Sequence, residues 1–117
     1  MKRIYIFIGC CLFAYLFSAC EEESTVQLQN NISAVKVTDV KWGNNFLSNE
    51  LLPGESSGKK TIYSYREELP KTERVTFKMV ANNKTVYLET EEGFTLEEGK
   101  DLLIVLSDDT KVKNPNN

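Results

Sequence analysis

Residues 75–90 alternate between apolar and polar side chains with a period of two, and an Asn82-Asn83 pair divides them in half. The alternating apolar residues are Val75, Phe77, Met79 and Ala81 before the pair, and Val86 and Leu88 after it. Asparagine tolerates the left-handed dihedrals that a two-residue hairpin turn requires. The segment therefore predicts a β-hairpin with its tip at Asn82-Asn83.

The same rhythm of short segments between turn residues runs through the chain from Val26 onward. Residues 35–42 alternate except for one extra residue at Thr38-Asp39, which predicts a β-bulge. The loop over residues 51–58 contains Pro53-Gly54, a pair typical of a tight turn. Two further short strands are predicted over residues 61–65 and 94–96. The continuous apolar run over residues 102–106 predicts a central strand, and residues 110–113 are predicted to form a last strand at an edge.

No window of the sequence has helical periodicity. Six to seven short strands divided by Gly, Asn and Pro predict an all-β fold, a single antiparallel β-sandwich of immunoglobulin-like or transthyretin-like type. The strand order stays open, because the cysteine pair of immunoglobulin domains and the corner tyrosine before Leu102 are both missing. We predict the sandwich over residues 32–113 and a disordered tail over residues 114–117.

The first 19 residues have a composition of their own. Met1-Lys2-Arg3 supplies a positive start, and Ile4 to Phe17 is uncharged and strongly apolar. This run of about 14 residues is shorter than the roughly 20 that a membrane-spanning helix needs, and it matches the core of a signal peptide. We therefore predict a signal peptide over residues 1–19.

Leu16-Phe17-Ser18-Ala19-Cys20 resembles the lipobox of bacterial lipoprotein signals. The resemblance implies cleavage before Cys20 and acylation of that cysteine, so that the protein contacts the membrane through acyl chains. Each buried methylene contributes about 0.8 kcal/mol, and two or three chains hold firmly where one does not. The alternatives are an ordinary secretory signal cut after Ala19 and an uncleaved membrane anchor.

The acidic run Glu21, Glu22 and Glu23 follows the cysteine directly. It resembles the surface-export signal of lipoproteins from the Bacteroidota, which implies the outer face of the outer membrane. The alternative is a solvated polar tether, the usual role of a short acidic run. We predict the lipidated cysteine and its polar acidic tether over residues 20–31.

A second likeness lies inside the predicted domain. Trp42-Gly43-Asn44-Asn45-Phe46-Leu47, followed by Leu51-Leu52-Pro53-Gly54-Glu55-Ser56, resembles a pattern of small β-sandwich lipoproteins of the Bacteroidota. The resemblance implies the sandwich fold and an outer-membrane lipoprotein, at the cell surface or on the periplasmic face. It brings no activity with it.

The composition argues against several kinds of chemistry. The chain has no histidine, the commonest metal ligand and the usual acid–base group near neutral pH. Without Cys10 and Cys11 of the signal peptide, Cys20 is the one remaining thiol, so neither a thiol metal site nor an internal disulfide can form. Removal of Lys2 and Arg3 leaves 12 basic and 17 acidic residues, a net charge of −5 that repels nucleic acid. We expect no catalytic residues, metal ligands or cofactor.

Two groups of side chains are candidate binding residues. Rings stack on sugar faces, so the first is an aromatic platform for a glycan, although aromatics on strands more often pack against neighbours; it comprises Trp42, Tyr63, Tyr65 and Tyr87. The second offers oxygens to calcium but lacks the ligand spacing of a known loop; it comprises Glu91, Glu92, Glu97, Glu98, Asp101, Asp108 and Asp109.

The sequence thus favours a lipid-anchored, exported, non-enzymatic module that meets a protein partner at the cell envelope. One way to do so is to add a strand at an exposed sheet edge. The alternative is a carbohydrate-binding accessory lipoprotein, which needs its aromatic residues exposed on one face. A small enzyme is the third hypothesis.

Overall fold

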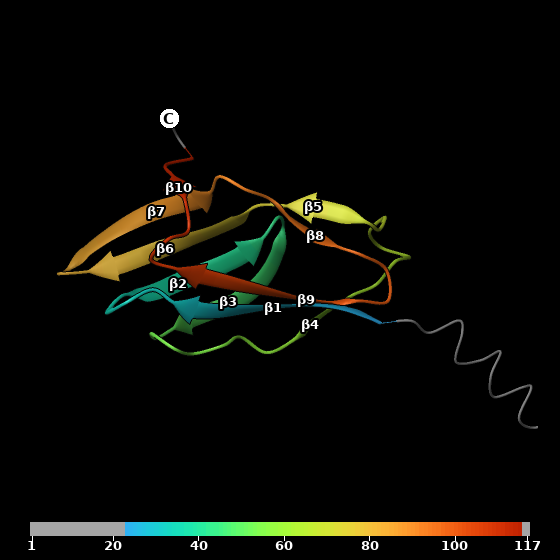
Figure 1. Ribbon diagram of the computed structural model, residues 1–117, viewed down its shortest axis with the longest axis horizontal. Coiled ribbons are helices and arrows are strands. Elements are labelled where there is room, and N and C mark those ends of the chain that lie inside the picture. The colour runs from blue at the N-terminus through green and yellow to red at the C-terminus, as the bar shows by residue number, and fades with distance from the viewer. Residues whose placement is uncertain (1–22, 116–117) are drawn as a thin grey trace, which may run out of the picture.

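The computed structural model describes residues 23–115, which form a β-sandwich of two facing sheets (Figure 1). Within this range six strands have seven or eight residues and four have two or three, which confirms the predicted fold class. The strands are β1 (Ser24–Asn31), β2 (Lys36–Trp42), β3 (Asn45–Leu51), β4 (Lys60–Ile62), β5 (Lys71–Glu73), β6 (Val75–Ala81), β7 (Lys84–Thr90), β8 (Phe94–Leu96), β9 (Asp101–Ser107) and β10 (Val112–Lys113).

The two layers differ in width and in strand direction. One sheet has five strands in the order β10-β7-β6-β2-β3, and every pairing in it is antiparallel. The other has three strands in the order β4-β1-β9, where β1 pairs antiparallel with β4 and parallel with β9. The short antiparallel pair β5-β8 forms a third, separate sheet, from which Leu96 is buried in the common core. The parallel pair is the one departure from the antiparallel arrangement expected from the sequence.

Strand β1 corrects the predicted domain boundary at residue 32. Its eight residues lie in the middle of the three-stranded sheet, and Val26 and Leu28 are fully buried. Residues 24–31 are therefore part of the sandwich and not of a polar tether. The strand was missed because Val26 and Leu28 are its only apolar residues, and it is completed by strands far away in the sequence.

Two local features predicted from the sequence are confirmed. The pairing of β2 with β6 shifts register between Thr38 and Lys41, and Asp39 has a φ of 49°. This bulge lets Val37 and Val40, three positions apart, both be fully buried. At the tip of the β6–β7 hairpin Asn82 and Asn83 have φ of 51° and 62°, as a two-residue turn with both residues left-handed requires.

The aromatic strand predicted over residues 61–65 is shorter than expected. Strand β4 ends at Ile62, and the backbone N–H groups of Arg66 and Glu67 both donate to the Tyr63 carbonyl at 3.0 and 3.1 Å. The chain therefore turns immediately after Tyr63. Strand β3 was not predicted at all, because it is a largely polar strand at the edge of its sheet.

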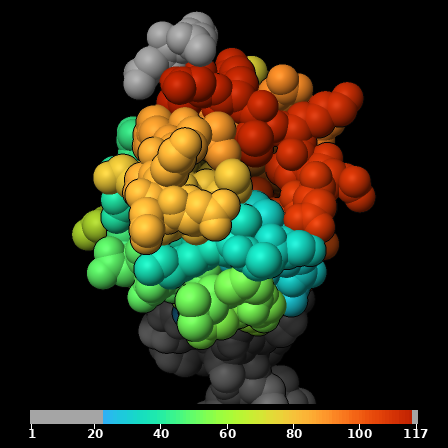
Figure 2. All heavy atoms as spheres, turned by 90° about the vertical axis from the view of Figure 1, so that its left-hand side faces the viewer, coloured from blue at the N-terminus to red at the C-terminus, as the bar shows by residue number. Residues whose placement is uncertain are grey.

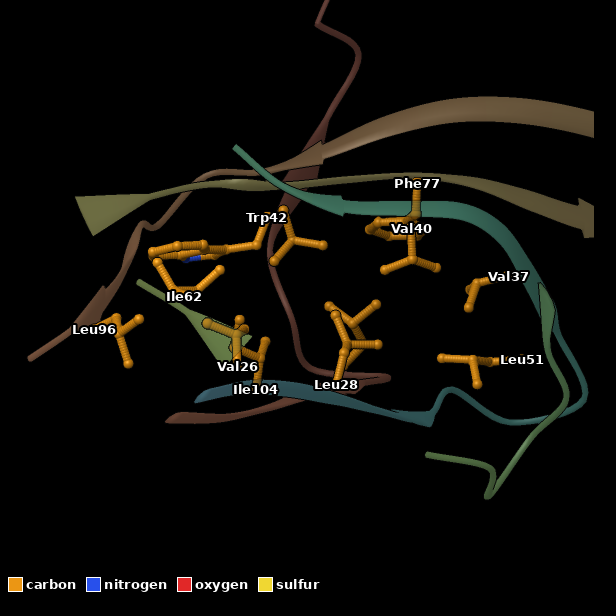
Figure 3. Close-up of a cluster of buried hydrophobic side chains, with 12 residues drawn as sticks. Val26, Leu28, Val37, Val40, Trp42, Leu51, Ile62, Phe77, Leu96 and Ile104 are labelled. Atoms are coloured by element: carbon orange, nitrogen blue, oxygen red, sulfur yellow. The ribbon is translucent and has the colours of Figure 1, made fainter. Parts of the chain in front are cut away.

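The core fills the space between the two sheets (Figure 3). Trp42 and Phe77 project from the five-stranded sheet towards Val26, Leu28 and Ile104 of the three-stranded sheet, and all five side chains are fully buried. The indole N–H of Trp42 donates to the Phe94 carbonyl at 3.0 Å. The largest side chain of the core thus leaves no polar atom unpaired.

The buried amide of Asn30 joins the end of β1 to the β1–β2 connection and to the end of β3. Its Nδ2 donates to the carbonyls of Val35 (2.9 Å) and Leu51 (3.0 Å), and its Oδ1 accepts from the Ile32 N–H (3.1 Å). The Asn30 backbone also bonds the predicted turn, donating to Glu55 O and accepting from Gly54 N. Gly54 has a φ of 89°, which suits glycine at the third position of a type II turn.

We predict that Asn30→Ala lowers the free energy of unfolding by about 2–4 kcal/mol, because it leaves buried carbonyls without a donor. Urea unfolding of residues 21–117 measures the change. Gln29→Ala, at the next position on the outer face of β1, is the control and should cost less than about 0.5 kcal/mol. Equal effects of the two substitutions would contradict a structural role for the amide.

Candidate functional site

Strand β9 lies at an edge of the three-stranded sheet. The sequence predicts a central strand here, and the structure corrects that prediction. In the described part of the chain it pairs with β1 alone. Ile104 and Leu106 are fully buried in the core, whereas Leu103 and Val105 are 55% and 39% exposed on the other face. The continuous apolar run is thus buried on one side only.

The backbone of β9 is oriented for pairing on its open side. The Thr25 N–H donates to the Lys100 carbonyl at 3.1 Å, at the start of the parallel ladder. In such a ladder alternate residues direct their backbone groups to the same neighbour, so those of Leu103 and Val105 point away from β1. Residues 101–107 contain no proline, lysine or register shift, the usual devices that protect a sheet edge.

Two cavities lie beside this edge, where the narrower sheet leaves the wider one partly uncovered. The first, of about 270 Å³, is lined by Phe94, Val105 and Lys111, among others. The second, of about 220 Å³, is mainly apolar and reaches Met79, Leu88 and Val112, which are half-buried. Both open between the end of β9 and the inner face of β7 and β10.

The lining of the second cavity includes Ser107, the last residue of β9, and Ile32, which follows β1, so this cavity lies at the end of the sandwich that Figure 2 faces. There the tip of the β6–β7 hairpin (orange) and the segment from β9 to β10 (red) lie beside each other, above the connection between β1 and β2 (cyan). Asp108 lines this cavity and binds Ser33 of that connection. Its Oδ1 accepts from the Ser33 N–H at 2.9 Å and its Oδ2 from the Ser33 hydroxyl at 2.7 Å.

These contacts stabilise the charged form of Asp108. The hydrogen bond from the Ser33 backbone, followed by that from its hydroxyl, holds the pKa of the Asp108 carboxyl below its ordinary value of 3.8. The ionised carboxylate therefore fixes the β9–β10 segment against the β1–β2 connection at neutral pH. One wall of the open cavity depends on this contact.

The four aromatic residues predicted as a sugar platform do not come together. Trp42 is fully buried, which corrects its assignment to an exposed ligand site. Tyr87 is paired with Lys78 on the outer face of the five-stranded sheet. Tyr63 and Tyr65 share the loop after β4, with ring centroids 5.3 Å apart and an angle of 30° between the planes. The platform is thus reduced to two rings.

The predicted acidic residues form no metal site in the part of the chain that the structure describes. No group of three or more His, Cys, Asp or Glu side chains is placed there to hold an ion. Asp101 accepts from the Thr25 hydroxyl at 2.6 Å and lies 3.8 Å from the Lys59 ammonium, so it has partners within the domain. Cys20, Glu21 and Glu22 lie outside the described residues, and Glu23 is the first residue within them.

A polar cavity of about 480 Å³ lies near the turn between β2 and β3. Its lining includes Glu73, Arg74 and Glu89. Arg74 pairs with Glu89 at 3.6 Å, and Glu73 with Lys71 at 3.7 Å. These charged groups are therefore paired with one another, as is usual for a solvated surface hollow.

Comparison of the chain with protein-family models, with curated proteins and with solved structures finds no match. In residues 23–115, no helix has the length and apolar character needed to cross a membrane. The assignment of function therefore depends on the geometry of this molecule, and the open edge at β9 is its most distinctive surface. The sequence predicted a central strand over residues 102–106, because a continuous apolar run is typical of a strand buried on both faces.

We predict that Asp108 titrates below pH 3.8 in the folded protein and that its contribution to stability is pH-dependent. Because the folded pKa is lower than the unfolded one, the contribution is fully present above the unfolded value and is lost as the pH falls through the folded value. Carboxyl NMR titration measures the pKa directly. In Ser33→Gly, which removes the hydroxyl donor but keeps the backbone N–H, the pKa should rise part of the way towards 3.8. An unchanged pKa would contradict the contribution of the hydroxyl.

Proposed function

We propose that this protein is a lipid-anchored, exported, non-enzymatic module of the cell envelope that binds an extended segment of a partner protein along β9. The observation that carries the binding function is the open edge, where Leu103 and Val105 are exposed and their backbone groups point away from β1. An added strand pairs through main-chain hydrogen bonds, and adjoining pockets for its side chains give specificity.

The lipid anchor is supported by the lipobox-like residues that end at Cys20 and by the position of the first strand. The sandwich begins with Ser24, so cleavage before Cys20 leaves all of its strands intact. The acidic run Glu21, Glu22 and Glu23 supports placement on the outer face of the outer membrane, as its resemblance to a surface-export signal implies. These features support an envelope lipoprotein in which only a few residues separate the folded domain from its lipid anchor.

The surroundings of β9 define the chemistry of the partner segment. Its side chains near the end of β9 are apolar, because the cavity beside Ser107 is lined by Met79, Leu88 and Val112, among others. At the first cavity it meets charges of both signs, since Glu92, Asp109 and Lys111 all line that cavity. A second copy of this acidic chain is disfavoured as the occupant, because like charges repel.

The alternative of a carbohydrate-binding lipoprotein has less support than the sequence suggested. Burial of Trp42 removes the largest ring of the platform, and Tyr87 lies on a different surface from the remaining pair. Two tilted tyrosine rings remain, on one loop. A small enzyme has no support from this geometry, because the polar hollow holds paired charges and the chain has no histidine base.

We predict that a photo-crosslinking amino acid at Val105 traps the partner in intact cells. Adding Leu103→Pro should abolish the adduct, because proline removes an N–H that points away from β1 and blocks pairing on the open side alone. Leu103→Thr, which keeps the N–H and the strand propensity, should retain it. The same crosslinker at Tyr87 controls for random collision; identical adducts at both positions, or an adduct that survives Leu103→Pro, would exclude strand addition.

We predict that Cys20→Ala abolishes acylation and releases the protein from the membrane fraction, because no acyl chain then holds it. Mass spectrometry of the N-terminal peptide and ultracentrifugation measure the two effects. Cys10→Ala and Cys11→Ala are matched controls inside the apolar run and should leave both unchanged. Undiminished membrane retention of Cys20→Ala would disprove the lipid anchor.

A further inference from the structure

We infer that the loop over residues 63–66 contacts the lipid headgroups and sets the orientation of the sandwich on the membrane. This inference rests on the proposed lipid anchor at Cys20 and adds a second point of attachment to it. Two observations carry it, namely the shortness of the link between the anchor and β1, and the exposed aromatic side chains beside the start of that strand.

Only three residues separate Cys20 from Ser24. Even fully extended, the four residue steps between them span no more than about 14 Å. Ser24 is firmly held in the sandwich, since it is 1% exposed and its hydroxyl accepts from the Gly99 N–H at 2.8 Å. An acylated Cys20 therefore keeps this end of the domain close to the bilayer surface.

The loop that follows β4 lies at the same end of the molecule (Figure 1). Ser24 is the register partner of Ile62, and Tyr63 comes directly after Ile62. Neighbouring strands are about 4.8 Å apart and consecutive residues about 3.8 Å, so the loop begins within roughly 23 Å of the anchored cysteine at full extension of the link. It therefore lies within reach of the headgroup layer.

The side chains of the loop suit that layer. Tyr65 is 77% exposed and Tyr63 is 47% exposed, and the Arg66 guanidinium carbon lies 5.8 Å from the centre of the Tyr65 ring. Tyrosine places an apolar ring and a polar hydroxyl at the boundary between lipid and water, where it is enriched in membrane proteins. Two adjacent tyrosine rings that are exposed to water alone would not gain the free energy that partial burial in the headgroup layer provides.

The loop presents these rings from a fixed position. Its backbone closes on the Tyr63 carbonyl through the N–H groups of Arg66 and Glu67. The Glu67 carboxylate accepts from Asn45 Nδ2 and from Lys71 Nζ, both at 3.2 Å, and so ties the loop to β3 and β5. Membrane contact therefore needs little reordering of the loop.

This orientation also determines how β9 stands on the membrane. In the parallel ladder Asp101 pairs with Thr25 and Ser107 with Asn31, so β9 starts at the anchored end and runs away from it. The β6–β7 hairpin tip lies at the far end (Figure 1). Ser33 and Asp108, which are in contact, follow the paired ends of β1 and β9 at the same end. The open edge is then reached from the side, with its length leading outward from the bilayer.

The test uses the full lipidated protein, purified from membranes and reconstituted in phosphatidylcholine vesicles that contain a lipid with a nitroxide on its headgroup. Because acylation blocks Cys20, a fluorophore attached at Glu68→Cys reports on the loop, and one at Lys84→Cys reports on the far hairpin. We expect the fluorophore at residue 68 to be quenched severalfold more than that at residue 84.

Variants of the two rings separate the loop contact from the anchor. In the Glu68→Cys protein, Tyr63→Ser with Tyr65→Ser should lower the quenching, which stays above the level at residue 84 because the short link to Cys20 still holds this end near the bilayer. Tyr63→Trp with Tyr65→Trp should keep it. Tyr87→Ser, on the outer face of β7, is the matched control and should change nothing. Retention of the quenching in the serine variant, or equal quenching at both labelled positions, overturns the inference.

The outcome is distinguishable from failure of the lipid anchor itself. Mass spectrometry of the N-terminal peptide and co-flotation with vesicles report acylation at Cys20 before any quenching is measured. A protein that floats with the vesicles but shows equal quenching refutes the loop contact alone. A protein without acyl chains refutes the anchor, and the loop contact with it.

Discussion

The double-sided pairing of β1 is the interaction on which the rest of this structure depends. This strand is held between β4 and β9, and Val26 and Leu28 face the core from it. Full burial of such side chains contributes about 1.5–3 kcal/mol each, a large share of the stability of a domain this small. Because β1 is also the strand nearest Cys20, the core and the proposed anchor are joined with almost no flexible chain between them.

The features that the sequence predicted correctly are local ones, whose conformation depends on residues next to each other in the chain. The turn at Asn82-Asn83 and the bulge at Asp39 follow from the few residues that accept a positive φ at low cost. Strand β1 could not be found in this way, because its partners lie far along the chain and its sequence is mostly polar. The same non-local pairing decided that β9 is an edge, since residues 102–106 alone fit either position.

The candidate site was harder to predict than the fold, because exposure is a property of the assembled sheets. The four aromatic residues look equivalent in the sequence, yet Trp42 fills the core, Tyr87 lies on an outer face, and Tyr63 and Tyr65 share a loop. Their separation follows from where β4 ends and from which face of each strand meets the opposite sheet. Composition did reduce the number of catalytic mechanisms to consider, since a chain without histidine lacks the usual acid–base group.

If the proposed function is right, the parallel pairing of β1 with β9 fixes the position of the open edge relative to the membrane. The anchor fixes the start of β1, and the seven-residue register carries that position across to β9. If the partner belongs to the same membrane, its segment meets β9 at a high effective concentration, so a short stretch of main-chain pairing can bind well despite its small area. A partner segment that pairs antiparallel to β9 would run towards the membrane, and one that pairs parallel to β9 would run away from it. The direction of the added strand therefore depends on whether the partner's own membrane anchor precedes or follows the segment.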